Sequence, residues 1–67
     1  MNTPRLTWDA EVGAAYLYLT SEETLRQELA RSVWAEEGRI VFDLDAQGRV
    51  LGIEILGRQP GVAALDT

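Results

Sequence analysis

The stretch that decides the fold is "FDLDAQGRVLGIEIL", residues 42–56. Apolar and polar residues alternate on both sides of "DAQG" (45–48), which is the pattern of two half-buried β-strands. Asp at the first and Gly at the fourth position of "DAQG" are typical of a type I turn. The stretch therefore predicts a β-hairpin with strands at 40–44 and 50–56.

The register of this hairpin decides which face of the sheet its acids occupy, because a slip of one residue reverses every side chain. With an even-numbered loop, Phe42 pairs with Leu51, and one face is wholly apolar: Ile40, Phe42, Leu44, Leu51, Ile53 and Ile55. A three-residue loop with a G1 bulge at Gly48 also fits the turn, but it would turn Asp43 toward the apolar residues. Burying an unpaired carboxylate costs several kcal/mol, so the alternation favours the even-numbered loop.

The acids of this stretch, Asp43, Asp45 and Glu54, are the candidate metal ligands of the chain. A Ca²⁺ site needs more oxygen ligands than "DLDAQG" offers, and the closing Glu of an EF-hand loop is missing. Simpler roles explain all three: Asp45 opens the turn, Asp43 faces water, and Glu54 forms a cross-strand ion pair with Arg39. The sequence therefore predicts no metal and no cofactor.

The rest of the chain offers a second hairpin and one ambiguous segment. "LTWDAEVGAAYLYL" (6–19) reads as two short strands around a turn that Gly13 closes. In residues 20–28, Thr20 and Glu23 fit a capping box, so that a short helix competes with a loop or a single helical turn. Alternation favours a strand over 29–35.

Composition excludes several classes of site. The chain has no Cys and no His, and its six basic residues are all Arg, which rules out disulfides, thiolate metal sites, and Cys or imidazole catalysis. A net charge of −5 with scattered Arg residues argues against binding to nucleic acid or to anionic membranes. No membrane span or signal peptide is visible, so we expect a cytoplasmic protein.

Asp9 and Glu11 form a second pair of acids, in the turn of the first hairpin. Two neighbouring carboxylates can divide the roles of general acid and base. Turns are commonly acidic, however, and no Lys or His stands by to activate a Ser or Thr nucleophile.

Two segments resemble a known family. "WDAEVGAAYLYL" (8–19) and "FDLDAQGRVLGIEIL" (42–56) resemble the opening and the close of domain of unknown function family 2283, a family of small prokaryotic proteins. The residues that carry the resemblance are Asp9, Ala15, Tyr16, Leu19, Asp43, Asp45, Gly48, Arg49, Gly52, Ile53, Glu54 and Leu56. It implies a strand near "ARSV" (30–33), and Gly13 and Pro60 depart from the family pattern. It brings no activity with it.

We therefore predict a single domain, 1–67, with 58–67 as a tail or a short helical turn. Its fold is mainly β: an antiparallel β-meander of four or five strands with little helix, at 5–8, 14–19, 28–35, 40–44 and 50–56. The apolar face of so small a sheet needs a cover, so we predict a homodimer, formed sheet on sheet or by edge pairing. Its expected interface residues are Trp34, Phe42, Leu51, Ile53 and Ile55.

Two functions remain open from the sequence. The first is a non-catalytic, homo-oligomeric interaction or accessory module that binds another protein. The second is a carboxylate-based metal binder or small enzyme with a site at the dimer interface, built on Asp43 and Glu54 or on Asp9 and Glu11. Acids gathered in a pocket would favour the second, and acids spread over an open face would favour the first.

Overall fold

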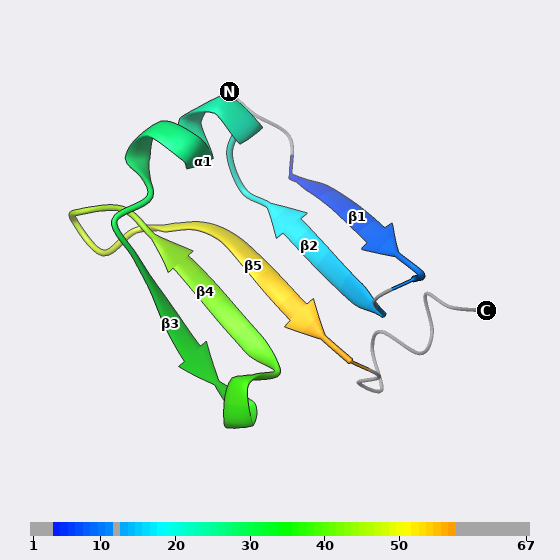
Figure 1. Ribbon diagram of the computed structural model, residues 1–67. Helices are drawn as coiled ribbons and strands as arrows, with labels where there is room; N and C mark the ends of the chain where they lie inside the picture. The colour runs from blue at the N-terminus through cyan, green and yellow to red at the C-terminus, as the bar shows by residue number, and fades with distance from the viewer. Residues whose placement is uncertain (1–3, 12, 58–67) are drawn as a thin grey trace.

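A computed structural model describes residues 4–11 and 13–57 as one five-stranded antiparallel sheet with a short helix (Figure 1). The elements in chain order are β1 (Arg5–Asp9), β2 (Ala14–Tyr18), α1 (Glu22–Glu28), β3 (Arg31–Ala35), the 3₁₀ turn η1 (Glu36–Gly38), β4 (Ile40–Leu44) and β5 (Val50–Leu56). The predicted antiparallel sheet with little helix is confirmed. The predicted tail or helical turn at 58–67 lies outside the described residues.

The strand order is β1-β2-β5-β4-β3, which is not that of a simple meander. The strands β3, β4 and β5 follow one another as neighbours, and so do β1 and β2, but the β1–β2 hairpin adds to the far side of β5. The predicted meander order is corrected because α1 carries the chain along one end of the sheet, past β5 and β4 (Figure 1). Three strand spacings are about 14 Å, and seven helical residues with flanking loops span that distance at about 1.5 Å per residue. The last strand, β5, is thereby central.

Residues 20–28, for which the sequence left a short helix, a loop or a single helical turn open, contain helix α1. Ser21 is its N-cap, and the Ser21 side chain accepts a hydrogen bond from the Thr24 backbone N–H at 3.1 Å. The cap is therefore Ser21 and not Thr20. No residue of α1 is buried, and the helix lies at one end of the sheet, away from its broad faces (Figure 1). Within residues 4–11 and 13–57, no helix has the length and apolar character of a membrane span.

The β4–β5 turn adopts the loop that the alternation argued against. The Gly48 N–H donates to the Asp45 carbonyl at 3.0 Å, and the Asp45 N–H donates to the Arg49 carbonyl at 2.9 Å. Gly48 has a φ of +84°, which glycine adopts without strain. This is a three-residue loop with a G1 bulge, so the predicted even-numbered loop is wrong.

A second bulge in β5 restores the apolar alternation. Leu44 lies opposite Val50, whereas Asp43 lies opposite Gly52, so Leu51 is an extra residue on β5. Beyond it, Phe42 pairs with Ile53 instead of with Leu51. The shift amounts to two residues in all, which returns the side chains of β5 beyond the bulge, from Gly52 to Ile55, to the faces that alternation predicted. Asp43 therefore stays off the apolar face.

Strand pairing sorts the side chains onto two faces, which we name here. The apolar face carries Leu6, Trp8, Ala15, Leu17, Val33, Ala35, Ile40, Phe42, Leu44, Ile53 and Ile55. The mixed face carries Arg5, Thr7, Tyr16, Tyr18, Ser32, Trp34, Val41, Asp43, Gly52 and Glu54. Arg31 lies at a corner of the apolar face, where β3 begins. Among the described apolar residues, few are buried: Ala15, Val41, Leu44 and Leu51.

Candidate functional site

The polar centre of the mixed face is the carboxylate of Asp43 on β4. The Tyr16 hydroxyl of β2 donates to its Oδ2 at 2.6 Å. The Ser32 hydroxyl of β3 donates to its Oδ1 at 2.6 Å. Both carboxylate oxygens therefore accept a hydrogen bond, and one network joins three strands.

Gly52 makes this network possible, because it lies on β5 between Tyr16 and Asp43. A Cβ on Gly52 would lie 2.7 Å from Cε2 and Cζ of Tyr16, which is closer than atoms can approach. A glycine inside a strand often marks such a close approach. The Tyr16 ring therefore crosses the central strand where no side chain obstructs it.

Aromatic contacts hold the Tyr16 ring from its other side. The rings of Tyr16 and Tyr18 lie 4.6 Å apart between centroids, at 61° to one another. The Arg5 guanidinium lies 4.5 Å from the centroid of the Tyr18 ring, within cation–π distance. Arg5 also forms an exposed ion pair with Glu22 of α1 at 2.6 Å. The β1 edge and the helix are thereby connected to the same aromatic pair.

The environment of Tyr16 keeps its phenol neutral. Burial of the ring raises the pKa of Tyr16 well above its ordinary value near 10, and the hydrogen bond to Asp43 and the negative charge of Asp43 raise it further. A phenol in this state donates a proton into a hydrogen bond and does not act as a base. The network therefore connects three strands through a neutral phenol and a carboxylate.

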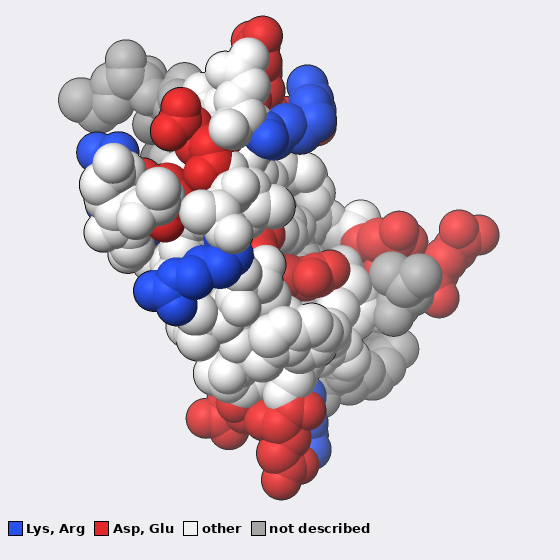
Figure 2. Space-filling view, turned by 60° about the vertical axis from the view of Figure 1, so that its left-hand side comes forward, with Lys and Arg blue, Asp and Glu red and all other residues white. Residues whose placement is uncertain are grey.

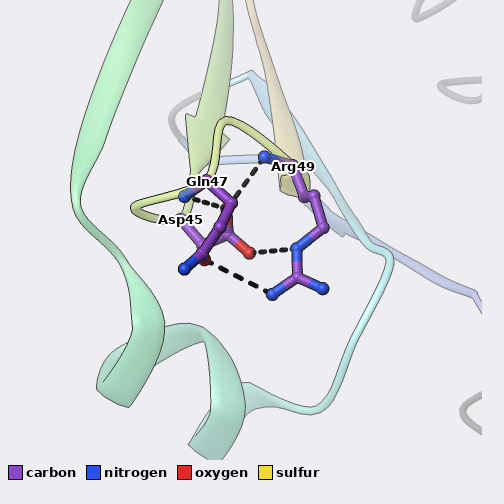
Figure 3. A network of polar contacts seen from close by, with 3 residues as sticks. All are labelled: Asp45, Gln47 and Arg49. Atoms are coloured by element: carbon purple, nitrogen blue, oxygen red, sulfur yellow. Dashed lines mark hydrogen bonds and ion pairs between the residues drawn. The ribbon is translucent and has the colours of Figure 1, made fainter.

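Asp45 lies apart from this network, inside its own turn (Figure 3). Its Oδ1 accepts from the backbone N–H groups of Gln47 at 2.9 Å and Arg49 at 2.8 Å, and its Oδ2 accepts from Nε of Arg49 at 2.7 Å. The residue is only 2% exposed. The Arg49 backbone N–H, assisted by the Arg49 side chain, lowers the pKa of Asp45. The predicted turn-opening role of Asp45 is confirmed.

Glu54 lies on the mixed face, opposite Val41 of β4 and next to Tyr16 of β2. The predicted ion pair between Glu54 and Arg39 is wrong, because the register has shifted by two residues. Arg39 instead lies 3.8 Å from Glu37 in an exposed pair. Asp43 and Glu54 thus share a face, while Asp45 is held in the turn. No three acidic groups of the described residues come together as a metal site.

Asp9 and Glu11 border an open hollow of about 440 Å³ beside the β1–β2 turn, which also includes Trp8, Tyr16 and Glu54. The Glu11 N–H donates to Oδ1 of Asp9 at 3.1 Å, so Asp9 caps the turn. The hollow holds carboxylates and aromatic rings, and the whole chain contains no His, Cys or Lys that could act as a nucleophile or general base there.

The predicted interface residues divide between the two faces. Phe42, Ile53 and Ile55 lie on the apolar face, and Leu51 is buried. Trp34 lies on the mixed face, opposite Val41, and is 65% exposed. Trp34 does not share a face with Phe42, because even-numbered residues of β3 point away from the apolar face. The interface itself stays a prediction.

The Tyr16–Asp43–Ser32 network and the role of Gly52 are not among the sequence-based predictions. A glycine at the centre of a strand is the one local signal that could have indicated a side chain crossing there. The partners of Asp43 come from β2 and β3, far from it in sequence, and no spacing rule connects them.

Comparison with known proteins places these features in a family. The family model described as "Protein of unknown function (DUF2283)" matches residues 5–57. The chain belongs to the DUF2283 family. The match begins at β1 and ends one residue after β5, so it includes every described strand of this DUF2283 domain. No curated protein and no solved structure matches the chain.

In this DUF2283 domain, Gly52→Ala should lower the free energy of unfolding by about 1–3 kcal/mol, because the added methyl group displaces the Tyr16 ring. In a Tyr16→Val background the same change should be neutral or stabilising, since alanine reduces the freedom of the unfolded chain. Urea unfolding of the four proteins measures the coupling between the two positions. An equal cost in both backgrounds would contradict the close approach.

Alkaline titration tests the neutral phenol of Tyr16. Because its pKa is raised in the folded state, its contribution to stability is complete below about pH 10 and is lost as the pH rises through the folded pKa. The free energy of unfolding should therefore fall above pH 10, and Tyr16→Phe should make that fall less steep. Phenolate absorbance of the two tyrosines should resolve one late ionisation. Equal slopes in both proteins would sink the assignment.

Acid titration tests Asp45. Its pKa is lowered from 3.8 by folding, so its contribution is present above pH 3.8 and is lost as the pH falls through the folded pKa. Asp45→Asn should be clearly destabilised at neutral pH, and the gap to the wild type should narrow in acid. Glu23→Gln, an exposed change on α1 that removes the same charge, is the control. A gap that stays constant with pH would refute the role of the carboxylate.

Proposed function

We propose that this DUF2283 protein is a non-catalytic protein-interaction module that acts through its apolar face. Helix α1 lies at one end of the sheet and has no buried residue, so no helix of the described residues 4–11 and 13–57 packs over that face (Figure 1). Apart from Ala15 and Leu44, its side chains are half-buried or exposed, with Leu6 at 46% and Val33 at 38%. Soluble chains rarely leave a contiguous apolar surface of this kind without a binding role. The uncovered sheet face is the observation that carries the proposal.

The dimensions of the molecule support it. The principal extents are 34 × 26 × 17 Å, so the chain is thin in one direction. Packed layers of secondary structure lie about 10 Å apart, and stable domains contain at least two of them around a core. The described residues form one layer, because α1 lies at the end of the sheet (Figure 1). The second layer has to come from elsewhere.

The use of the acids supports a non-catalytic role. Asp43 accepts from two hydroxyl groups, Asp45 accepts from its own turn, and Asp9 caps the first turn. Each of these carboxylates thus has a structural partner. In Figure 2 acidic side chains lie at several places on the surface, including a group at the lower end, where η1 lies in Figure 1. Of the acids that border the hollow beside the β1–β2 turn, Asp9 is used as the cap of that turn.

Charge favours a protein as the partner. The chain carries a net charge of −5, and Arg5, Arg39 and Arg49 are each in an ion pair. Nucleic acids and anionic lipids bind to clustered free cations, which these residues do not supply. An apolar protein surface can pack against the apolar face without clustered cations.

Hydroxyl-radical footprinting of the full chain tests the proposal, with the molecular mass measured on the same samples. Phe42 on the apolar face should be protected in the associated protein and several-fold more reactive when the protein is diluted to monomer, since dilution uncovers the face. Trp34 on the mixed face is the internal control and should be reactive throughout. Protection of Phe42 in a chain of monomeric mass would contradict an interaction role, because the chain would then cover its own face.

A further inference from the structure

Building on the proposed function, we infer that the occupant of the apolar face is a second copy of this chain, packed sheet on sheet about a two-fold axis. The apolar face is then the inner layer of a two-layer sandwich, and the mixed faces point outward on both sides. A two-fold interface requires a surface that is complementary to itself. Three properties of the apolar face meet that requirement: its charge, its size and its place in the sheet.

Charge distribution is the first. Two copies of a chain with a net charge of −5 repel each other unless their acids lie away from the contact. The strand residues of the apolar face include no acid, and Arg31 is the only charged residue among them, at a corner. Asp43 and Glu54 lie on the mixed face, and Glu36 and Glu37 lie in η1. Two apolar faces can therefore meet without bringing like charges together.

Size is the second. A stable interface buries about 800 Å² on each partner. The two larger extents of the molecule, 34 and 26 Å, bound a broad side of that order. Apolar side chains from all five strands contribute to this side, from Leu6 on β1 to Val33 on β3. One face-to-face contact is therefore large enough to hold a dimer.

The position of the apolar side chains, on the broad side of the sheet and not along its edges, argues against a dimer formed by edge pairing. Pairing through an edge, β1 or β3, would extend the sheet but would leave it a single layer. The apolar side chains would stay in water, and the buried core would not grow. Face-to-face packing buries them on both copies at once, which is the larger gain in free energy.

A second copy also satisfies the size limit on the fold. Chains of this length bury only about 60% of the surface that the unfolded chain exposes, so a single core contributes little stability. The chain has no Cys for a disulfide and no His or Cys for a zinc site, and association with a partner is a means of adding the missing core. Another copy is present wherever the chain is made. A second copy can therefore bury the apolar face without depending on any other protein.

The geometry of the sandwich follows from the strand order. Because β5 is central, Ile53 and its neighbour Phe42 lie near the middle of the apolar face, and Val33 lies toward the β3 side. Aligned sheets cross at about 30° and lie about 10 Å apart. The Tyr16–Asp43–Ser32 network then lies on the outside of each layer, away from the contact.

Neighbouring residues of one edge strand provide a matched test. Val33 faces the apolar side and Trp34 the mixed side, and both are exposed within one chain, so a charge at either position leaves the protomer core intact. Sedimentation equilibrium of the full chain should show twice the 7.4 kDa mass of one chain. Val33→Glu should weaken the dimer by about 100-fold or more, because symmetry places two carboxylates in the contact. Trp34→Glu should change the dissociation constant by less than about 3-fold.

Leu17→Glu, on the opposite side of β5, is the second variant and should act as Val33→Glu does. Circular dichroism of each variant checks that the sheet is retained. Equal effects of Val33→Glu and Trp34→Glu, or no effect of either on a dimer, would overturn the face-to-face arrangement. A wild-type monomer up to millimolar concentration would overturn the second copy. If Phe42 is reactive in that monomer, the proposed interaction role stands and only the second copy is refuted. If Phe42 is protected in the monomer, the interaction role and the second copy are both refuted.

Discussion

The two bulges of the β4–β5 hairpin act together, and the division of the sheet into two faces depends on them. Gly48 adds one residue to the turn, which alone would reverse the side chains of β5 relative to β4. The extra residue at Leu51 reverses them again, so that Phe42 and Ile53 share the apolar face. Because β5 is the central strand, its register is passed on to β2 and through it to β1. The two bulges together thus keep the alternating apolar side chains of β4 and β5 on the same face of the sheet.

The same register brings Gly52 opposite Asp43, and this determines the mixed face. A larger residue at that point would separate Tyr16 from Asp43, and the hydrogen-bonded connection across β5 would be lost. The raised pKa of Tyr16 and the two hydroxyl donors on Asp43 indicate that these polar groups are used to fasten strands. In a small sheet with few buried apolar residues, such cross-strand contacts supply stability that a core would otherwise provide.

Unlike the mixed face, the apolar face has, among the described residues, no cross-strand polar contacts that use its side chains. A one-layer sheet satisfies its backbone hydrogen bonds within itself but cannot remove the apolar side chains of one face from water. Most of the apolar side chains whose alternation orders the strands therefore stay half-buried or exposed in the described chain. The membership of the chain in the DUF2283 family agrees with a shared fold over all five strands, and the family description assigns it no activity.

The sequence by itself determined the strands, the acidic surface, the absence of His and Cys chemistry, and the apolar alternation of "FDLDAQGRVLGIEIL", because each depends on local pattern or composition. It also predicted the turn-opening role of Asp45, which acts within its own loop. Only the tertiary structure decided the strand order, the second bulge at Leu51, the contact of Tyr16 with Asp43, and the face on which Trp34 lies. Each of these depends on residues far apart in the chain, whose relative positions are set by how strands pair and pack.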